Sequence, residues 1–182
     1  TKGTTDSKVV LIEYGDYQCA GCASVNKRIN ALAEDYNDQL VIVFRNYTID
    51  RHQNALSAAA AAESANLQGK FWEMHNLIYD NQSEWSTAGV TERNDLYLSY
   101  AKQLGLDETK FTEGMKDTSV RKKIEFDKAV AKKAGLDSTP YFTLNGEKID
   151  YETWSDDAKF RAKIDQVLKD NGIAPPATEK SE

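Results

Sequence analysis

The pattern of apolar and polar positions places strand-like runs towards both ends of the chain and helix-like segments between them. Residues 9–14 and 40–44 are short β-branched apolar runs, which are typical of strands buried on both faces. Between these runs, apolar residues recur every three or four positions over residues 25–36, as in an amphipathic helix. The first quarter of the chain is therefore predicted to be β-α-β.

The middle of the chain follows helical spacing. Apolar periodicity and helix-ending glycines predict helices over residues 54–66, 71–79, 91–104, 108–115 and 120–134. The strand pattern then returns over residues 141–144 and 147–149, on either side of Asn145-Gly146. An Asn-Gly pair between two short strands predicts a type I′ hairpin. A last amphipathic helix follows, with Ser155 as its expected N-cap.

This order of elements predicts an α/β fold with an inserted helical subdomain. We expect a discontinuous domain of residues 8–51 and 135–172, a helical insertion of residues 52–134, and flexible ends over 1–7 and 173–182. The length of 182 residues is sufficient for a sizeable core. The chain has neither an initiator Met nor a signal peptide, so we expect a trimmed mature domain.

Charge and hydropathy exclude two classes of function. The formal net charge is -6, so the protein would be repelled by the anionic backbone of nucleic acid, and nonspecific nucleic-acid binding is not expected. No run approaches the roughly 18 apolar residues that a membrane-spanning helix needs. Composition by itself leaves the cellular compartment open, because a single cysteine pair fits both reducing and oxidising environments.

The candidate chemistry lies in the only two cysteines of the chain, Cys19 and Cys22. If both lie on the first turn of a helix, their i,i+3 spacing places the sulfurs on one face, close enough for a disulfide. The expected chemistry is then a reversible dithiol/disulfide couple. The alternative is a pair of small buried apolar residues without redox function.

Other ligand-bearing residues are weaker candidates. A zinc site built from both cysteines with His52 and His75 would lack the close histidine spacing of a zinc finger, so no metal is expected. We expect His52 to be solvated near a helix start, although it could approach the active-site groove. His75 is predicted to be a packed core imidazole. Arg45 is either a charge partner near the site or a side chain that extends to solvent.

Three segments carry a resemblance to a known family. They are Tyr-Gly-Asp-Tyr-Gln-Cys-Ala-Gly-Cys at 14–22, Gln-Gly-Lys-Phe-Trp-Glu-Met-His at 68–75, and Ser-Thr-Pro-Tyr-Phe-Thr-Leu-Asn-Gly at 138–146. The chain resembles the DsbA-like thiol:disulfide oxidoreductases of the thioredoxin superfamily, particularly the Gram-positive type. The resemblance implies a thioredoxin fold that is interrupted by the helical insertion. It also implies a cis peptide bond between Thr139 and Pro140, packed against the cysteines, where the Thr139 backbone can pair with an extended client segment.

The resemblance assigns roles within the motif. Cys19, at a helix N-terminus that lowers its pKa, is expected to be the attacking sulfur, and Cys22 the buried resolving partner. The Ala20-Gly21 dipeptide departs from relatives that carry Pro and His there, so we expect acidification mainly by the helix end and a less extreme oxidant. Glu13 corresponds to an acidic group beneath the site, where it would exchange a proton with Cys22. The alternative for Glu13 is a strand-end carboxylate that faces water.

The resemblance also implies a biological role. The expected function is an extracytoplasmic oxidase that introduces disulfides into exported proteins and needs no cofactor beyond the Cys19–Cys22 disulfide. Its reoxidising partner would be a membrane protein linked to quinone, of the DsbB or vitamin K epoxide reductase-like type, and the chain is expected to be a monomer. A reductase, an isomerase or a redox-inert client-binding module remain alternatives, because spacing does not fix the direction of electron flow.

Overall fold

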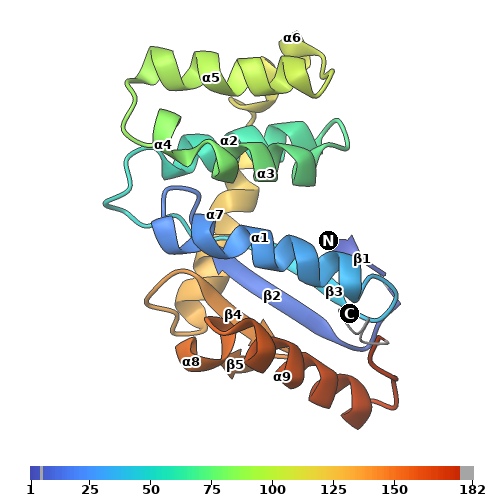
Figure 1. Cartoon of the computed structure of the whole chain (residues 1–182). Coiled ribbons are helices and arrows are strands. Elements are labelled where there is room, and N and C mark those ends of the chain that lie inside the picture. Colours follow the sequence, from blue (N-terminus) through green and yellow to red (C-terminus); the bar gives the residue numbers. More distant parts are fainter. Residues whose placement is uncertain (5, 177–182) are drawn as a thin grey trace. The chain divides into compact units, whose positions relative to one another are not determined.

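The computed structural model describes residues 1–4 and 6–176, which Figure 1 draws with its helices and strands labelled. In this part of the chain, the strands are β1 (Lys2–Gly3), β2 (Val10–Gly15), β3 (Val41–Asn46), β4 (Tyr141–Leu144) and β5 (Glu147–Ile149). The helices are α1 (Ala20–Asp35), α2 (Ala55–Asn66), α3 (Phe71–Asp80), α4 (Gln82–Trp85), α5 (Val90–Gln103), α6 (Glu108–Gly114), α7 (Thr118–Lys133), α8 (Tyr151–Trp154) and α9 (Asp157–Asp170). No helix within the described residues is long and apolar enough to cross a membrane.

The chain forms two compact units. The sheet unit comprises Thr1–Glu13, Lys27–Phe44 and Tyr141–Glu182, and the helical unit comprises Tyr14–Asn26 and Arg45–Pro140. The cysteine pair and the Thr139-Pro140 segment both belong to the helical unit. The predicted domain boundaries at 51/52 and 134/135 differ from the borders of these units and stay a prediction.

The strands form one sheet in the order β1-β3-β2-β4-β5. Strands β4 and β5 pair antiparallel, with Phe142 opposite Ile149. The turn between them has positive φ at both central positions, 49° at Asn145 and 88° at Gly146. Both positive values are what a type I′ turn requires, so the hairpin prediction is confirmed.

The first residues are a correction to the sequence prediction. A flexible lead-in was expected over residues 1–7, but Lys2 and Gly3 form β1, which pairs antiparallel with β3. A Cβ on Gly3 would lie 2.1 Å from the backbone oxygen of Leu40, so only glycine permits this approach. The two-residue strand has no periodicity from which it could be predicted. Of the expected flexible C-terminal segment, residues 177–182 lie outside the described residues.

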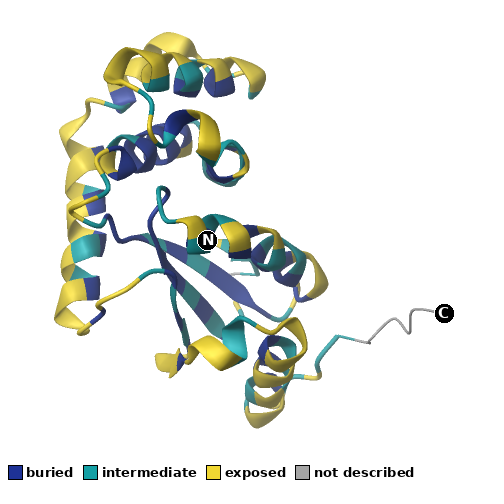
Figure 2. Cartoon of the chain, turned by 60° about the vertical axis from the view of Figure 1, so that its left-hand side comes forward, coloured by how far each residue is buried: buried dark blue, intermediate teal, exposed yellow. Residues whose placement is uncertain are grey.

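The core of the sheet unit combines strand residues with the inner faces of α1 and α9, as the dark blue segments of Figure 2 indicate. Its fully buried apolar side chains include Leu11, Ile29, Leu32, Ile42, Phe142, Phe160, Ile164 and Leu168. Phe160, Ile164 and Leu168 recur every four positions and form the predicted stripe of the last helix. Asp156 caps this helix by accepting from the Lys159 amide, so the expected Ser155 cap was wrong by one residue.

Helix α2 is the centre of the helical unit. It is rich in alanine and largely buried, and it packs against α3, α5, α6 and α7. Small side chains let neighbouring helices approach closely, which explains how one short helix contacts four others. The α/β class and the helical character of the middle of the chain are thus confirmed.

A buried charge cluster joins α2 and α7 to the end of β3. Asp127 is completely buried and accepts from Arg45 Nη1 at 2.8 Å and from the Asn46 backbone amide at 3.2 Å. Lys123 lies between Asp127 and the buried Glu63, pairing with both carboxylates. Two cations thus balance two buried carboxylates, as buried charges require. Arg45 is therefore the charge partner of Asp127, rather than a side chain extended to solvent.

Candidate active site

The short connection between β2 and α1 positions Cys19. Its backbone amide donates to the Asp16 carbonyl at 3.0 Å, and its own carbonyl accepts from the Ala23 amide at 3.1 Å. Cys19 therefore occupies the N-cap position directly before Ala20, where backbone amides of the first helical turn have no helical partner. The first turn of α1 carries no acidic residue that would compete for these amides.

The local environment favours the thiolate of Cys19. A hydrogen bond with the Cys22 side chain is the largest influence on its pKa, which falls from 9.0 to about 5. Partial burial opposes this fall, while the Thr139 side chain and the backbone amides of Cys22 and Gly21 lower the pKa further. The predicted direction is thus correct, but the predicted cause was not. The helix end contributes through two amides and is secondary to Cys22.

The two sulfurs differ in access. Cys22 is completely buried, whereas Cys19 is partly exposed and carries the lowered pKa. Both are thiols in this structure, one turn apart at the start of α1. An exposed thiolate beside a buried thiol is the asymmetry that an attacking and a resolving sulfur need.

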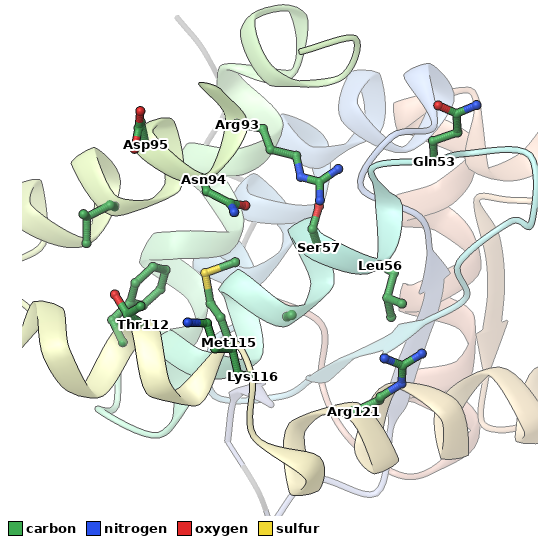
Figure 3. Close-up of a pocket in the computed structure, with 13 residues that line it drawn as sticks. Gln53, Leu56, Ser57, Arg93, Asn94, Asp95, Thr112, Met115, Lys116 and Arg121 are labelled. Carbon is green, nitrogen blue, oxygen red and sulfur yellow. The ribbon is translucent and has the colours of Figure 1, made fainter. Parts of the chain in front are cut away.

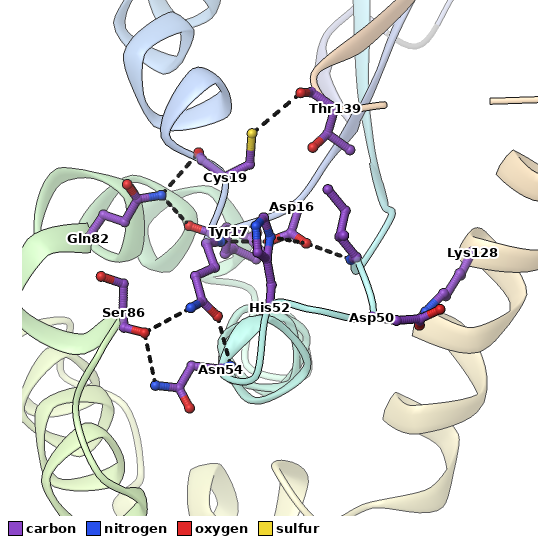
Figure 4. Close-up of polar contacts among 12 residues, drawn as sticks. Asp16, Tyr17, Cys19, Asp50, His52, Asn54, Gln82, Ser86, Lys128 and Thr139 are labelled. Carbon is purple, nitrogen blue, oxygen red and sulfur yellow. Dashed lines mark hydrogen bonds and ion pairs between the residues drawn. The ribbon is translucent and has the colours of Figure 1, made fainter. Parts of the chain in front are cut away.

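Residues from the far end of the helical unit complete the surroundings of Cys19. The Cys19 thiol donates to the Thr139 carbonyl at 3.4 Å, as Figure 4 shows, and the Thr139-Pro140 peptide bond is cis. A Cβ on Gly21 would lie 3.2 Å from Cδ of Pro140 and 3.7 Å from Sγ of Cys19. Cys19, Gly21, Thr139 and Pro140 thus meet as the family resemblance implied, whereas the side chain of Ala20 is exposed.

Glutamine side chains fix the backbone before Cys19. Gln82 of α4 donates to the Tyr17 carbonyl at 2.6 Å and to the Cys19 carbonyl at 3.1 Å (Figure 4). Gln18 donates to the Ser86 carbonyl at 2.9 Å and accepts from the Asn54 amide at 2.8 Å. The insertion therefore holds the reactive loop directly through hydrogen bonds.

Asp16 and His52 form a second support that the sequence analysis misjudged. The Asp16 carboxylate is buried and accepts from the amides of Gln18 at 2.7 Å and Ile49 at 2.6 Å. Nδ1 of His52 lies 3.0 Å from the same carboxylate, and the His52 side chain is only 19% exposed. The expectation of a solvated His52 was therefore wrong, because the imidazole contacts the buried carboxylate of Asp16, three residues before Cys19.

His75 is the packed imidazole that was predicted. It is 1% exposed, with Nδ1 at 2.9 Å from the Tyr17 hydroxyl and Nε2 at 3.2 Å from the Asn26 amide oxygen. Both histidines therefore have partners other than the cysteines. Within the described residues, no group of three or more His, Cys, Asp or Glu side chains is placed to hold a metal ion. The expectation of no metal and no cofactor stays a prediction.

Glu13 belongs to β2 and to the sheet unit. It is 2% exposed, so the alternative of a glutamate facing water was wrong. Its exchange of a proton with Cys22 stays a prediction.

Sequence reasoning missed Gln82, Asn54 and Asp16 as supports of the site. Apart from the local contact of Asp16 with the Gln18 amide, their partners lie 31 to 65 residues away along the chain, so no local periodicity could indicate them. The only sequence signal for these supports was a polar residue at the edge of an apolar helix. This pattern is so common that it does not identify a residue that supports the active site.

Solved structures of bacterial proteins are similar to this chain, and one of them is named as a thiol-disulfide exchange protein. "BdbD from Bacillus subtilis (oxidised)" aligns with a TM-score of 0.79 and 23% identity, covering 92% of this chain and 91% of that chain. "The thiol-disulfide exchange protein alpha-DsbA2 from Wolbachia pipientis" aligns with a TM-score of 0.77 and 22% identity, covering 91% and 85%. At this identity the likeness establishes the fold, which is a thioredoxin fold with a helical insertion, as predicted.

Curated relatives carry a different name. The "Na(+)/H(+) antiporter NhaA 1" of Mycolicibacterium vanbaalenii is 34% identical over 150 residues, which make up 80% of this chain and 23% of the antiporter. The "Na(+)/H(+) antiporter NhaA" of Herminiimonas arsenicoxydans is 31% identical over 148 residues, or 81% and 22%. The chain therefore spans less than a quarter of the length of these relatives.

A family model gives the assignment that these names leave open. The model described as "Thioredoxin" matches residues 1–166, which include the cysteine pair, the whole helical unit and most of the sheet unit. With its CxxC pair at the start of α1 and its DsbA-type fold, the chain belongs to this thioredoxin family.

Proposed function

We propose that this chain is a thiol:disulfide oxidoreductase that exchanges disulfides with other proteins through Cys19 and Cys22. The observation that carries the proposal is the pKa of Cys19, lowered to about 5 beside a completely buried Cys22. At neutral pH such a thiol is mostly thiolate, which is both the nucleophile and the better leaving group in disulfide exchange. A redox-inert binding module has no need of this lowered pKa.

The exchange has two steps. A client thiolate attacks Sγ of Cys19 in the oxidised protein, forming a mixed disulfide and breaking the Cys19–Cys22 bond. The electron pair of that bond passes to Cys22, which then takes up a proton. A second client thiolate attacks the client sulfur of the mixed disulfide, forms the client disulfide and releases Cys19 as a thiolate. Two electrons thus pass from the client to the cysteine pair.

The lowered pKa supports the oxidising direction. Interactions that stabilise the Cys19 thiolate exist only in the reduced protein, so they make the disulfide form more oxidising. The Ala20-Gly21 dipeptide adds no cation or ring to this stabilisation, so we expect a less extreme oxidant than the strongest relatives. We expect a reduction potential above the roughly -270 mV of thioredoxin. A value at or below that of thioredoxin would favour the reductase alternative.

Thr139 and Pro140 are the proposed client contacts. The Thr139 carbonyl already lies within 3.4 Å of the reactive sulfur, so a strand of client placed beside this segment would present its cysteine to Cys19. Glu13 is proposed to supply or accept the Cys22 proton. A Glu13→Gln variant should then slow resolution of the mixed disulfide by Cys22, the step in which Cys22 gives up its proton, whereas an unchanged rate would remove this role.

The biological setting is also part of the proposal. Reduced exported proteins would be the clients, in an extracytoplasmic compartment where disulfides persist. A membrane partner linked to quinone, of the DsbB or vitamin K epoxide reductase-like type, would reoxidise a monomeric enzyme. The antiporter activity named for the curated relatives is not carried over, because the match covers less than a quarter of those proteins.

Trapping of the mixed disulfide tests the central proposal. Oxidised wild-type protein should oxidise a reduced, unfolded multi-cysteine client such as reduced ribonuclease A. A Cys22→Ser variant, activated at Cys19 with dithiobis(nitrobenzoate), should accumulate a covalent adduct with a reduced client that carries a single cysteine, because neither Cys22 nor a second client thiol is present to displace Cys19. A Cys19→Ser variant, treated in the same way, should form little adduct, because its remaining thiol is buried. Equal adduct from both variants, or none from either, would contradict the proposal.

A further inference from the structure

A pocket of about 470 Å³ opens within the helical unit, away from the cysteine pair in sequence (Figure 3). Residues of α2, α5, α6 and α7 line it, together with the turn that follows α6. Its size falls within the range of small-molecule sites in proteins. It plays no part in the disulfide exchange proposed above.

The interior of the pocket is apolar. Phe111 is 1% exposed and Ala60 is 9% exposed, so these two side chains form its floor. Leu98 and Met115 are half-buried in its wall, and Leu56 lies at the edge with 37% of its surface exposed. An apolar chain bound here would therefore exchange water for aliphatic and aromatic side chains.

The edge of the pocket is cationic. Arg93, Lys116 and Arg121 line it with one lining carboxylate, Asp95, although the whole chain carries a formal charge of -6. Nε of Arg121 also pairs with the Glu125 carboxylate at 3.1 Å, so the cations still outnumber the carboxylates. In Figure 3 the guanidinium of Arg93 lies beside Ser57, and that of Arg121 lies near Leu56. This local reversal of charge favours an anionic head group.

Arg93 is a cation of the pocket that is held in place by a neighbouring side chain. Its Nη1 donates to the side-chain oxygen of Asn54, which leaves the guanidinium held at one end. Asn54 thus positions the guanidinium of Arg93, and a carboxylate is the group that a guanidinium binds best.

We propose that this pocket binds a single-chain carboxylate amphiphile, of the medium-chain fatty acid class. The carboxylate would contact Arg93 and Arg121, and the alkyl chain would lie against Leu98 and Phe111. An inorganic anion would leave the apolar wall unused, and a neutral lipid would leave the cationic edge unused.

Calorimetric titration with defined probes tests the proposal. Octanoate should bind the full chain saturably with one site at low ionic strength. Decanoate should bind roughly tenfold more tightly, because two further methylenes are buried. Acetate lacks the chain and octylammonium has the opposite charge, so neither should saturate. Absence of saturable binding by octanoate and decanoate would overturn the proposal, as would equal binding of octylammonium.

Neighbouring cations on α7 give a matched pair of variants. Arg121→Gln should weaken octanoate binding roughly twofold to fivefold, since an exposed charge–charge contact is lost. Lys122→Gln removes the same charge from an exposed residue that does not line the pocket, and it should leave binding unchanged. An equal loss in both variants would mean nonspecific attraction to the surface and would refute the site. Because the measurement is binding by itself, its failure would leave the disulfide exchange proposal untouched.

Discussion

Sγ of Cys19 lies 3.4 Å from the backbone carbonyl oxygen of Thr139, although 120 residues separate them along the chain. Both residues belong to the helical unit, so the reactive sulfur and the proposed client segment share one compact body. The same unit supplies Gln82, Gln18 and Asn54, which hold the loop before Cys19. The insertion therefore contributes to the site itself.

The hydrogen bond between the two cysteines predicts how the Cys19 pKa responds to substitution. Cys22→Ala removes the largest cause of the lowered pKa, so the pKa of Cys19 should rise from about 5 towards that of an ordinary thiol. Cys22→Ser keeps a donor and should give a smaller rise. Thiolate absorbance at 240 nm against pH measures both. A Cys19 pKa that is unchanged in Cys22→Ala would refute the assignment.

The lowered pKa also predicts how the stability of the reduced protein depends on pH. The pKa of Cys19 is 9.0 for an ordinary thiol and about 5 in the folded protein, so ionisation of Cys19 stabilises the fold. This contribution to the free energy of unfolding is fully present above pH 9 and is lost as the pH falls from 9 to 5. The disulfide form has no such group. The Tm of the reduced protein relative to the oxidised protein should therefore fall as the pH decreases over this range. Reduced Cys19→Ser should lack this component.

Removal of the Gln82 amide should loosen the start of α1. Gln82→Met keeps the length of the side chain but cannot donate to the Tyr17 and Cys19 carbonyls. We expect a loss of about 1–2 kcal/mol in the free energy of unfolding, because a buried acceptor loses its partner. The Cys19 pKa should rise as the first helical turn loses its alignment. Urea titration and thiolate absorbance measure the two effects.

Gln103→Met is the control for this experiment. Gln103 is exposed near the end of α5, and its replacement should change neither quantity. If both variants behave alike, the Gln82 contacts do not support the site.

The close approach of Gly21 to Pro140 predicts an asymmetry within the dipeptide. Gly21→Ala would place a methyl group 3.2 Å from Cδ of Pro140, which should cost about 1 kcal/mol of stability through overpacking. Introduction of His at the same position should cost more. Ala20→His projects into solvent and should be tolerated. Comparison of thermal unfolding of the three variants measures the difference, and equal costs at both positions would contradict it.

The sequence predicted the elements whose signals are local. Apolar runs located β2 and β3, the Asn145-Gly146 pair located the hairpin, and the CxxC spacing located both sulfurs. The short elements β1, α4 and α8 were missed, because two or four residues carry no periodicity. Polar partnerships such as Asp16 with His52 depend on tertiary packing, which single-residue patterns do not contain. The role of Cys22 in lowering the Cys19 pKa likewise needed the arrangement of the first turn.

The side-chain amide nitrogen of Asn54 donates to backbone carbonyls at the end of α4 and directly after it, those of Trp85, Ser86 and Ala88. Its backbone amide meanwhile donates to Gln18, the residue directly before Cys19. Local unfolding of the connection between α4 and α5 would therefore release the support of the reactive loop at the same time. A protease cut in this connection should accordingly impair the thiol chemistry, even though the cut leaves both cysteines in place.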